Sequence, residues 1–141
     1  MIAAIVLFVL LGLIISIFLL SAILSRRSFA RRFVVRSRSD PISQLVSFGA
    51  DAMMLVDFLN RIESLLGIPK GTLRLDDRFL VELSPDKRWA IYNPSGDILD
   101  DVSRYWPDDA KKIVTVRDFL SFVLQWIRNG ATKGEIIKKV L

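Results

Sequence analysis

The sequence predicts a single N-terminal transmembrane helix followed by a small α+β cytoplasmic domain that is mostly helical. Residues 2–24 contain no charged side chain, six arginines follow within residues 26–38, and two strongly amphipathic helical patterns occupy residues 52–66 and 116–129. These observations divide the chain into a membrane anchor at residues 1–25, a basic juxtamembrane linker at 26–40 and a domain at 41–141 with a C-terminal tail helix. About 100 residues are sufficient for one small domain with its own core.

The apolar run at residues 2–24 is long enough to cross a bilayer. Its 23 residues would form a helix of roughly 34 Å, and the hydrocarbon core is about 30 Å thick. A cleaved signal peptide instead combines a basic n-region, an apolar core of about 7–15 residues and a small-residue cleavage site. Here no Lys or Arg precedes the run, and the run exceeds that length. We therefore predict an uncleaved single-pass anchor.

The arginines after the run predict its orientation: Arg26, Arg27, Arg31, Arg32, Arg36 and Arg38. Cytoplasmic flanks of membrane spans carry an excess of Lys and Arg, so we expect the N-terminus outside and the domain on the cytoplasmic side of the plasma (inner) membrane. Each arginine near an anionic surface contributes about 1 kcal/mol, which predicts contact with anionic lipid head groups. If the helix continues, Phe29 and Phe33 lie on one stripe until Pro41 ends it.

The basic charge of the chain is concentrated in this arginine-rich segment. Residues 1–39 hold six of the 20 basic residues and no acidic one, so residues 40–141 carry 14 basic and 15 acidic side chains, a net charge of −1. Arginines interleaved with aromatic residues can also bind single-stranded nucleic acid. The position of the arginines beside the membrane and the nearly neutral domain favour lipid, and we do not expect a nucleic-acid partner.

The helix predicted at residues 52–66 begins after Asp51, a favourable N-cap residue. Its apolar residues recur at helical spacing: Leu55, Phe58, Leu59, Ile62, Leu65 and Leu66. Asp57 and Arg61 would pair one turn apart on the opposite side. Gly67 is a favourable C′ residue, so the helix should end before Pro69.

The helix predicted at residues 116–129 begins with Thr115 and Asp118, an approximate capping box. Its apolar residues form a second amphipathic stripe: Phe119, Phe122, Val123, Trp126 and Ile127. Gly130 closes this helix. A short tail helix at residues 134–141 would dock on the domain or bind a partner.

The region between these helices has a pattern typical of short strands. The segments TLRL (72–75), RFLVEL (78–83) and RWAIY (88–92) predict a small antiparallel hairpin or meander that packs on the helices. The segments SPDK and NPSG separate or follow them as turns. The segment DILDDVSRYW (97–106) fits either a strand or a helical turn.

The composition argues against an enzyme. The chain has no histidine and no cysteine, which excludes the common nucleophilic triads and zinc sites, and it has no glycine-rich phosphate-binding motif. Asp97, Asp100 and Asp101 would share one face of a helix and could hold Mg²⁺. The acidic pairs at residues 76–77 and 108–109 are typical of solvated surface. We predict no catalytic residue, no cofactor and no metal site.

Four aromatic residues concentrate in the middle of the domain: Trp89, Tyr92, Tyr105 and Trp106. Packing of a small sheet onto the helices is one interpretation. A recognition surface for a protein partner is the other, because Trp and Tyr are enriched at binding hot spots.

Two segments resemble parts of the acyl-carrier-protein family. FGADAMMLVDFLNRIESLLGI (48–68) is similar to the loop and second helix that present the phosphopantetheine serine, with Gly49 and Asp51 matching and Ala52 at the serine position. VTVRDFLSFVLQWI (114–127) is similar to the last helix of the family. In a competing register, residues 58–83 resemble the first helix and the loop after it, and SPDKRW then stands where the serine motif belongs. Both registers imply a degenerate carrier-like bundle that carries no phosphopantetheine.

These observations lead to two main functional hypotheses. The first is a non-enzymatic interaction or adaptor protein that binds a protein partner at the cytoplasmic membrane face. The alternative is a membrane-tethered, carrier-like accessory protein in lipid or acyl metabolism. A small hydrolase or metal-dependent enzyme that uses Asp97, Asp100 and Asp101 is a third hypothesis.

Overall fold

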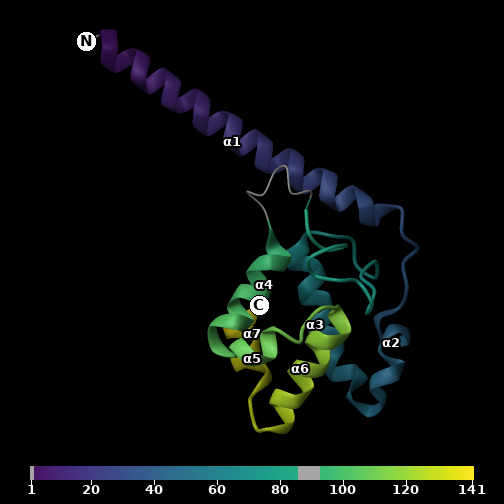
Figure 1. The fold of residues 1–141 in the computed structure, drawn as a ribbon. Coiled ribbons are helices and arrows are strands. Elements are labelled where there is room, and N and C mark those ends of the chain that lie inside the picture. The colour runs from purple at the N-terminus through teal and green to yellow at the C-terminus, as the bar shows by residue number, and fades with distance from the viewer. Residues whose placement is uncertain (1, 86–92) are drawn as a thin grey trace.

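The structure, a computed structural model, describes residues 2–85 and 93–141 and contains one long helix that projects from a compact group of shorter ones (Figure 1). Every regular element of the described residues is helical: α1 (Ile2–Val34), α2 (Pro41–Gln44), the 3-10 helix η1 (Val46–Asp51), α3 (Ala52–Leu66), α4 (Pro94–Tyr105), α5 (Pro107–Ala110), α6 (Val116–Arg128) and α7 (Lys133–Val140). The prediction of a mostly helical domain is confirmed.

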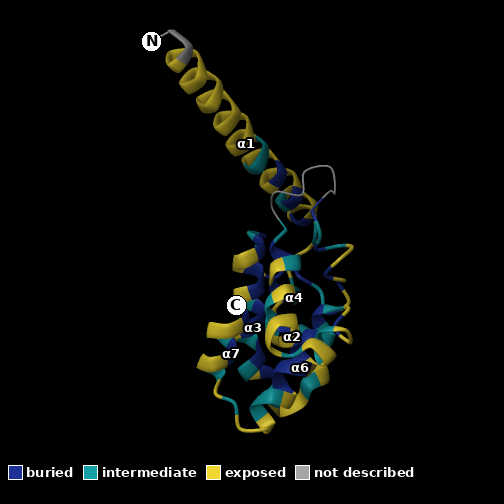
Figure 2. Cartoon of the chain, turned by 60° about the vertical axis from the view of Figure 1, so that its left-hand side comes forward, coloured by how far each residue is buried: buried dark blue, intermediate teal, exposed yellow. Residues whose placement is uncertain are grey.

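Helix α1 combines a membrane-length apolar part with a part that belongs to the domain. It has 33 residues, which corresponds to roughly 50 Å. It is the one helix of the described residues that is long and apolar enough to cross a membrane, with a mean hydropathy of 3.0 and an exposed apolar surface (Figure 2). The helix runs past the predicted anchor boundary at residue 25 and through most of the arginine-rich segment.

The last turns of α1 pack into the hydrophobic core. Phe29 and Phe33 are each only 1% exposed and belong to the same buried cluster as the apolar faces of α3 and α6. Their ring centroids are 5.2 Å apart, as expected for aromatic residues one turn apart on one stripe. The helix that would cross the membrane is therefore continuous with the core of the domain.

Helices α3 and α6 supply about half of the buried core residues. The fully buried residues of these two helices include Leu55, Phe58, Leu59, Ile62, Leu66, Phe119, Leu120 and Val123. The predicted bounds of α3 are confirmed, and Gly67 ends it in the left-handed conformation, with φ of 65°.

The polar partners predicted for α3 differ from those observed. Asp51 does not cap the helix with its side chain; it forms an ion pair with Arg128, 2.8 Å between Oδ2 and Nη2. The reason is that η1 leads directly into α3, so the backbone of Asp51 is already helical. Asp57 pairs with Lys133, not with the predicted Arg61.

Capping boxes start the two C-terminal helices. Thr115 and Asp118 form the predicted box at α6, where each side chain accepts a hydrogen bond from the backbone of the other residue. Thr132 and Glu135 form a second box at α7. That motif is visible in the sequence as Thr-x-x-Glu, and it moves the start of the tail helix to Lys133, one residue before the predicted start.

The predicted strands at residues 72–75 and 78–83 are wrong. These segments form turns, and one isolated antiparallel bridge between Arg78 and Thr115 is the only β-type pairing in the described part of the chain. The physical reason is that carboxylates take the backbone donors that a neighbouring strand would need. Asp77 accepts the amide of Arg74 at 2.8 Å, and Glu82 accepts the amide of Arg78 at 2.8 Å.

Two further predictions concern residues 88–92 and 97–106. The predicted strand RWAIY, with Trp89 and Tyr92, lies outside the described residues. The segment 97–106, which fitted either a strand or a helical turn, is helical through Tyr105. Asn93 caps this helix through a hydrogen bond from the amide of Gly96 at 3.2 Å, and Pro94 occupies the first turn.

Candidate functional site

The junction between α1 and the domain is the most elaborate polar and apolar contact surface in the described residues. Ser25, Phe29 and Phe33 form its buried stripe, which we call the docking face. Arg27 and Arg31 lie roughly 160° around the helix from Phe29, and both are exposed. The helical period therefore divides the arginine-rich segment into a domain side and an outer side.

On the domain side, Arg36 joins the segment after α1 to a buried carboxylate. Its Nη1 lies 2.6 Å from Oδ2 of Asp77, which is 5% exposed, and its guanidinium stacks on the ring of Phe33 at 4.5 Å. The same guanidinium donates to the carbonyl of Thr72 at 3.4 Å. A buried carboxylate requires a partner of opposite charge, so Asp77 holds the guanidinium of Arg36 in a fixed position against the domain.

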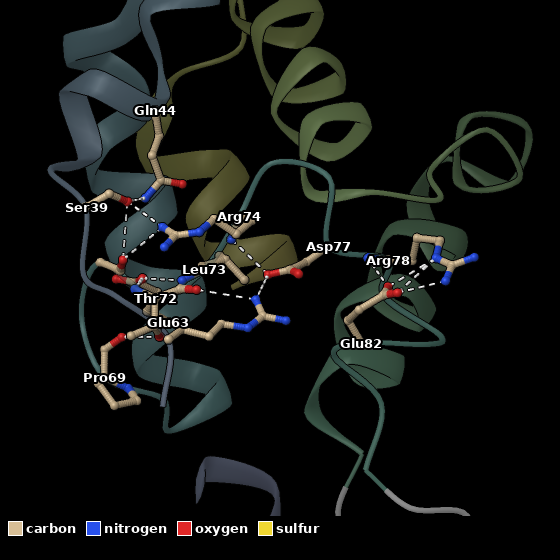
Figure 3. Close-up of polar contacts among 12 residues, drawn as sticks. Ser39, Gln44, Glu63, Pro69, Thr72, Leu73, Arg74, Asp77, Arg78 and Glu82 are labelled. Atoms are coloured by element: carbon tan, nitrogen blue, oxygen red, sulfur yellow. Dashed lines mark hydrogen bonds and ion pairs between the residues drawn. The ribbon is translucent and has the colours of Figure 1, made fainter. Parts of the chain in front are cut away.

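Glu63 fixes the loop that receives this segment. It is fully buried on α3, and its Oε1 accepts the amides of Thr72 and Leu73, each at 3.0 Å (Figure 3). The loop in turn contacts the chain after α1, because the amide of Ser39 donates to the carbonyl of Gly71 at 2.9 Å. A carboxylate that accepts two amides is a strong local clamp.

Gly71 allows this close approach. Its φ is 78°, and an added Cβ would lie 2.7 Å from the carbonyl oxygen of Ser39. Arg74 adds hydrogen bonds from its guanidinium to Ser39 Oγ and to the carbonyl of Ser37 (Figure 3 shows the Arg74–Ser39 contact). Backbone and side-chain contacts therefore hold residues 36–39 against the domain.

The remaining arginines differ in their contacts. Arg32 donates from Nη2 to the carbonyl of Ser84 at 2.9 Å and stacks on Phe29 at 5.1 Å. The guanidinium of Arg26 lies beside Gly67, and its Nε is 3.2 Å from the point that a Cβ on that glycine would occupy. Arg38 is exposed after the helix. Contact of the six arginines with lipid head groups stays a prediction, and Arg27 and Arg31 face away from the domain.

A cleft of about 910 Å³, the junction cleft, opens between α1 and the turn at residues 80–85. Its apolar walls are Ile17, Leu20, Leu24, Leu80, Val81 and Pro85. Its polar lining consists of Ser21, Ser25, Ser28, Arg32 and Ser84. The cleft thus begins within the apolar run of α1 and ends among the first arginines.

An ion pair stabilises the turn that forms the second wall of this cleft. Arg78 and Glu82 approach to 2.7 Å, and Glu82 also accepts the amide of Arg78. These hydrogen bonds from Arg78 lower the pKa of Glu82 to about 2. The side chain of Leu83 is fully buried and anchors the turn in the core.

A second, smaller hollow of about 410 Å³ lies between η1 and α6. The Asp51–Arg128 ion pair borders it, together with Phe48 and Leu124. Arg117 donates to Ser47 Oγ at 3.1 Å beside it. These contacts join η1 to α6.

The described members of the predicted aromatic surface have different environments. Trp106 packs against Trp126 with ring centroids 4.3 Å apart and against Phe122 at 5.4 Å. Tyr105 is 47% exposed, and the ammonium of Lys139 lies 5.5 Å from its ring centroid. Trp106 therefore contributes mainly to packing, whereas Tyr105 presents a ring at the surface.

The carboxylates of α4 do not form a metal site. Asp97 and Asp100 are exposed, and Asp101 pairs with Arg104 at 3.4 Å. In residues 2–85 and 93–141, no group of three or more acidic side chains could hold a metal ion. The geometry gives no basis for the hydrolase hypothesis.

Comparisons of the chain with models of known protein families, with curated proteins and with solved structures give no match. The acyl-carrier resemblance consequently depends on its two sequence segments. Ala52, the residue at the serine position of that resemblance, is 7% exposed at the first turn of α3.

Proposed function

We propose that this chain is a single-pass, membrane-anchored adaptor protein without enzymatic activity. Its N-terminus lies outside, and its helical domain binds a protein partner at the cytoplasmic face of the plasma (inner) membrane. The observation that carries the proposal is the continuity of α1, which runs from a membrane-length apolar segment into the core of the domain at Phe29 and Phe33.

This continuity supports a function in which orientation matters. Leu24, the last residue of the apolar run, and Phe29, the first core residue of α1, are five residues apart, so roughly 8 Å of helix separates the membrane boundary from the core. A flexible linker would leave the domain free to rotate, whereas a docked helix fixes which surface faces the bilayer. A domain held in this way meets membrane-bound partners at high effective concentration.

The sequence and the surface support binding as the activity. The chain contains no histidine and no cysteine, the residues that most often carry nucleophilic and metal-dependent catalysis. Tyr105 and Lys139 form an exposed aromatic and cationic pair where α4 and α7 meet. Together with Trp89 and Tyr92 of the sequence, Tyr105 is our proposed contact surface for the partner.

Affinity purification from detergent-solubilised membranes tests the adaptor proposal. We expect the full-length chain to recover a defined partner and Tyr105→Ala to lower its recovery several-fold. Met53→Ala is the matched control, because Met53 is also exposed, at 69%, but lies on α3. Recovery of the same partner by residues 1–40 alone would show that the domain is not the binding module.

The second candidate is a membrane-tethered accessory protein of lipid or acyl metabolism with a degenerate carrier-like bundle. It is motivated by the two carrier-like segments and by a domain whose described residues form helices. The burial of Ala52 is consistent with a bundle that does not present a phosphopantetheine arm at this position. Recovery of acyl-transferring enzymes in the same purification would favour this candidate over a general adaptor.

A further inference from the structure

The junction cleft has the dimensions and polarity of a site for one membrane lipid. Ile17 and Leu24 lie on its apolar side, and Ser28 and Arg32 lie on its polar side. The 11 residues from Ile17 to Ser28 correspond to roughly 17 Å along the helix, close to the roughly 15 Å of hydrocarbon in one leaflet. An acyl chain beside Ile17 and Leu24 would therefore place its head group near Arg32.

The domain supplies the opposite wall with exposed apolar side chains. Leu80 and Val81 are 65% and 51% exposed, although they lie in a turn anchored by the buried Leu83. The Arg78–Glu82 ion pair and the hydrogen bond from the amide of Leu83 to the carbonyl of Arg78, 3.1 Å, keep this turn in place. Two adjacent exposed apolar residues in a fixed turn beside a membrane helix are well placed to contact lipid chains.

The polar end of the cleft carries a positive charge that has no acidic partner within residues 2–85 and 93–141. Arg32 bonds to the carbonyl of Ser84 and stacks on Phe29, and no ion pair of the described residues includes it. Arg36, one turn later, is by contrast neutralised by Asp77. An anion at the mouth of the cleft would therefore find a preoriented guanidinium.

A polar group inside the cleft also lacks a partner. Ser21 Oγ is shielded from solvent and has no hydrogen-bond partner among the described residues. It lies two turns before Ser28 on the same side of α1 and lines the same cleft. Ser21 lies between Ile17 and Leu24 along α1, so this hydroxyl lies at the depth of the acyl chain, and the head-group contact of the site depends on Arg32.

We propose that the junction cleft binds one anionic phospholipid of the cytoplasmic leaflet. Its acyl chain lies between α1 and the side chains of Leu80 and Val81, and its phosphate contacts Arg32. A lipid is the fitting occupant because the cleft is continuous with the lipid-facing surface of α1. The guanidinium of Arg32, which forms no ion pair with another described residue, selects an anionic head group. The volume of about 910 Å³ is at the upper end of the roughly 300–1,000 Å³ typical of small-molecule sites. This inference rests on the membrane insertion of α1 and does not require the protein partner.

Native mass spectrometry of the full-length chain in detergent tests the proposal, with equal amounts of a phosphatidylglycerol and a phosphatidylcholine added. We expect one retained phosphatidylglycerol per chain and much weaker retention of phosphatidylcholine. Arg32→Gln should lower retention of the anionic lipid about 5- to 10-fold. Arg31→Gln is the matched control on the outer side of the helix and should change it less than 2-fold. Arg32→Lys keeps the charge and should retain most of the binding.

A second variant tests the cleft independently of charge. Ser28→Phe places a large ring in the cleft from an exposed position, so it should exclude the lipid while the helical content by circular dichroism stays unchanged. Retention of the lipid by Ser28→Phe would overturn the proposal. Equal retention of both lipids, or equal losses in Arg31→Gln and Arg32→Gln, would overturn it as well. Vesicle flotation of the same variants reports membrane insertion separately, and partner recovery tests the adaptor function.

Discussion

Replacing Phe33 by alanine should release α1 from the domain. Phe33 is 1% exposed, packs on Phe29 and supports the guanidinium of Arg36. Truncating a fully buried phenylalanine costs about 3–5 kcal/mol, a large fraction of the roughly 5–15 kcal/mol that stabilises a domain of this size. Because the other core residues of α3 and α6 remain, we expect the loss to act first on the junction.

Hydrogen–deuterium exchange of the full-length chain in detergent micelles measures this release. The amide of Ser39 is a direct reporter, because it bonds to the carbonyl of Gly71 across the junction and neither residue lies in a helix. A loss of about 3–5 kcal/mol corresponds to an exchange rate at Ser39 that is roughly 10²- to 4 × 10³-fold faster. The amide of Ala131, bonded to the carbonyl of Trp126 at 3.1 Å, reports the rest of the domain and should remain protected.

Val34→Ala is the control for this experiment, because Val34 belongs to the same helix but is 67% exposed. A surface substitution of this kind should change stability by no more than about 0.5 kcal/mol. An exchange rate at Ser39 that rises less than tenfold in Phe33→Ala, or equally in both variants, would refute the docking argument.

Two further predictions concern carboxylates near the junction. Glu63→Ala should lower the free energy of unfolding by about 1–3 kcal/mol, because it leaves the buried amide of Leu73 without an acceptor and leaves the amide of Thr72 only its longer bond to the carbonyl of Pro69, 3.3 Å. Thermal unfolding followed by circular dichroism measures this loss of stability. Glu63→Gln keeps a hydrogen-bond acceptor and should lose less stability than Glu63→Ala. Equal stability of Glu63→Ala and the parent chain would contradict the role of Glu63 in fixing the loop. The lowered pKa of Glu82 adds stability above pH about 4.5 that is lost as the pH falls towards about 2. Since solvent screens this exposed pair, the effect should be small and should disappear in Arg78→Gln; an unchanged acid dependence of unfolding in that variant would exclude the pair as its source.

Strong local signals predicted the helical part of the fold correctly. The apolar period, Gly67 and the Thr115–Asp118 box together determine where α3 ends and α6 begins, and the structure confirms these positions. Such signals act within one or two turns, so the sequence alone contains them. The helical stripe of Phe29 and Phe33 was also predictable, although its packing partner was not.

The incorrect predictions involve competition between side chains and backbone. TLRL and RFLVEL have the composition of strands, but Glu63, Asp77 and Glu82 accept amides from this region and favour turns. Asp51 has the right chemistry for an N-cap, but η1 places it in a helical backbone. Asp77 and Glu82 lie only three and four residues from the amides that they accept, so strand propensity fails here because it does not include this local competition for backbone donors; only Glu63 acts from a more distant part of the chain.

The two functions of the arginine-rich segment follow from the period of the helix. A count of basic residues does not distinguish the six arginines by their position around the helix. The sequence alone therefore predicts lipid contact for all six. Once Phe29 and Phe33 are buried, the 3.6-residue period assigns Arg32 to the domain side and Arg27 and Arg31 to the outer side. The same segment can then attract the anionic membrane on one side and fix the domain on the other. In the membrane orientation that we propose, a helix that carries both functions without a linker converts the position of the bilayer into a defined orientation of the domain.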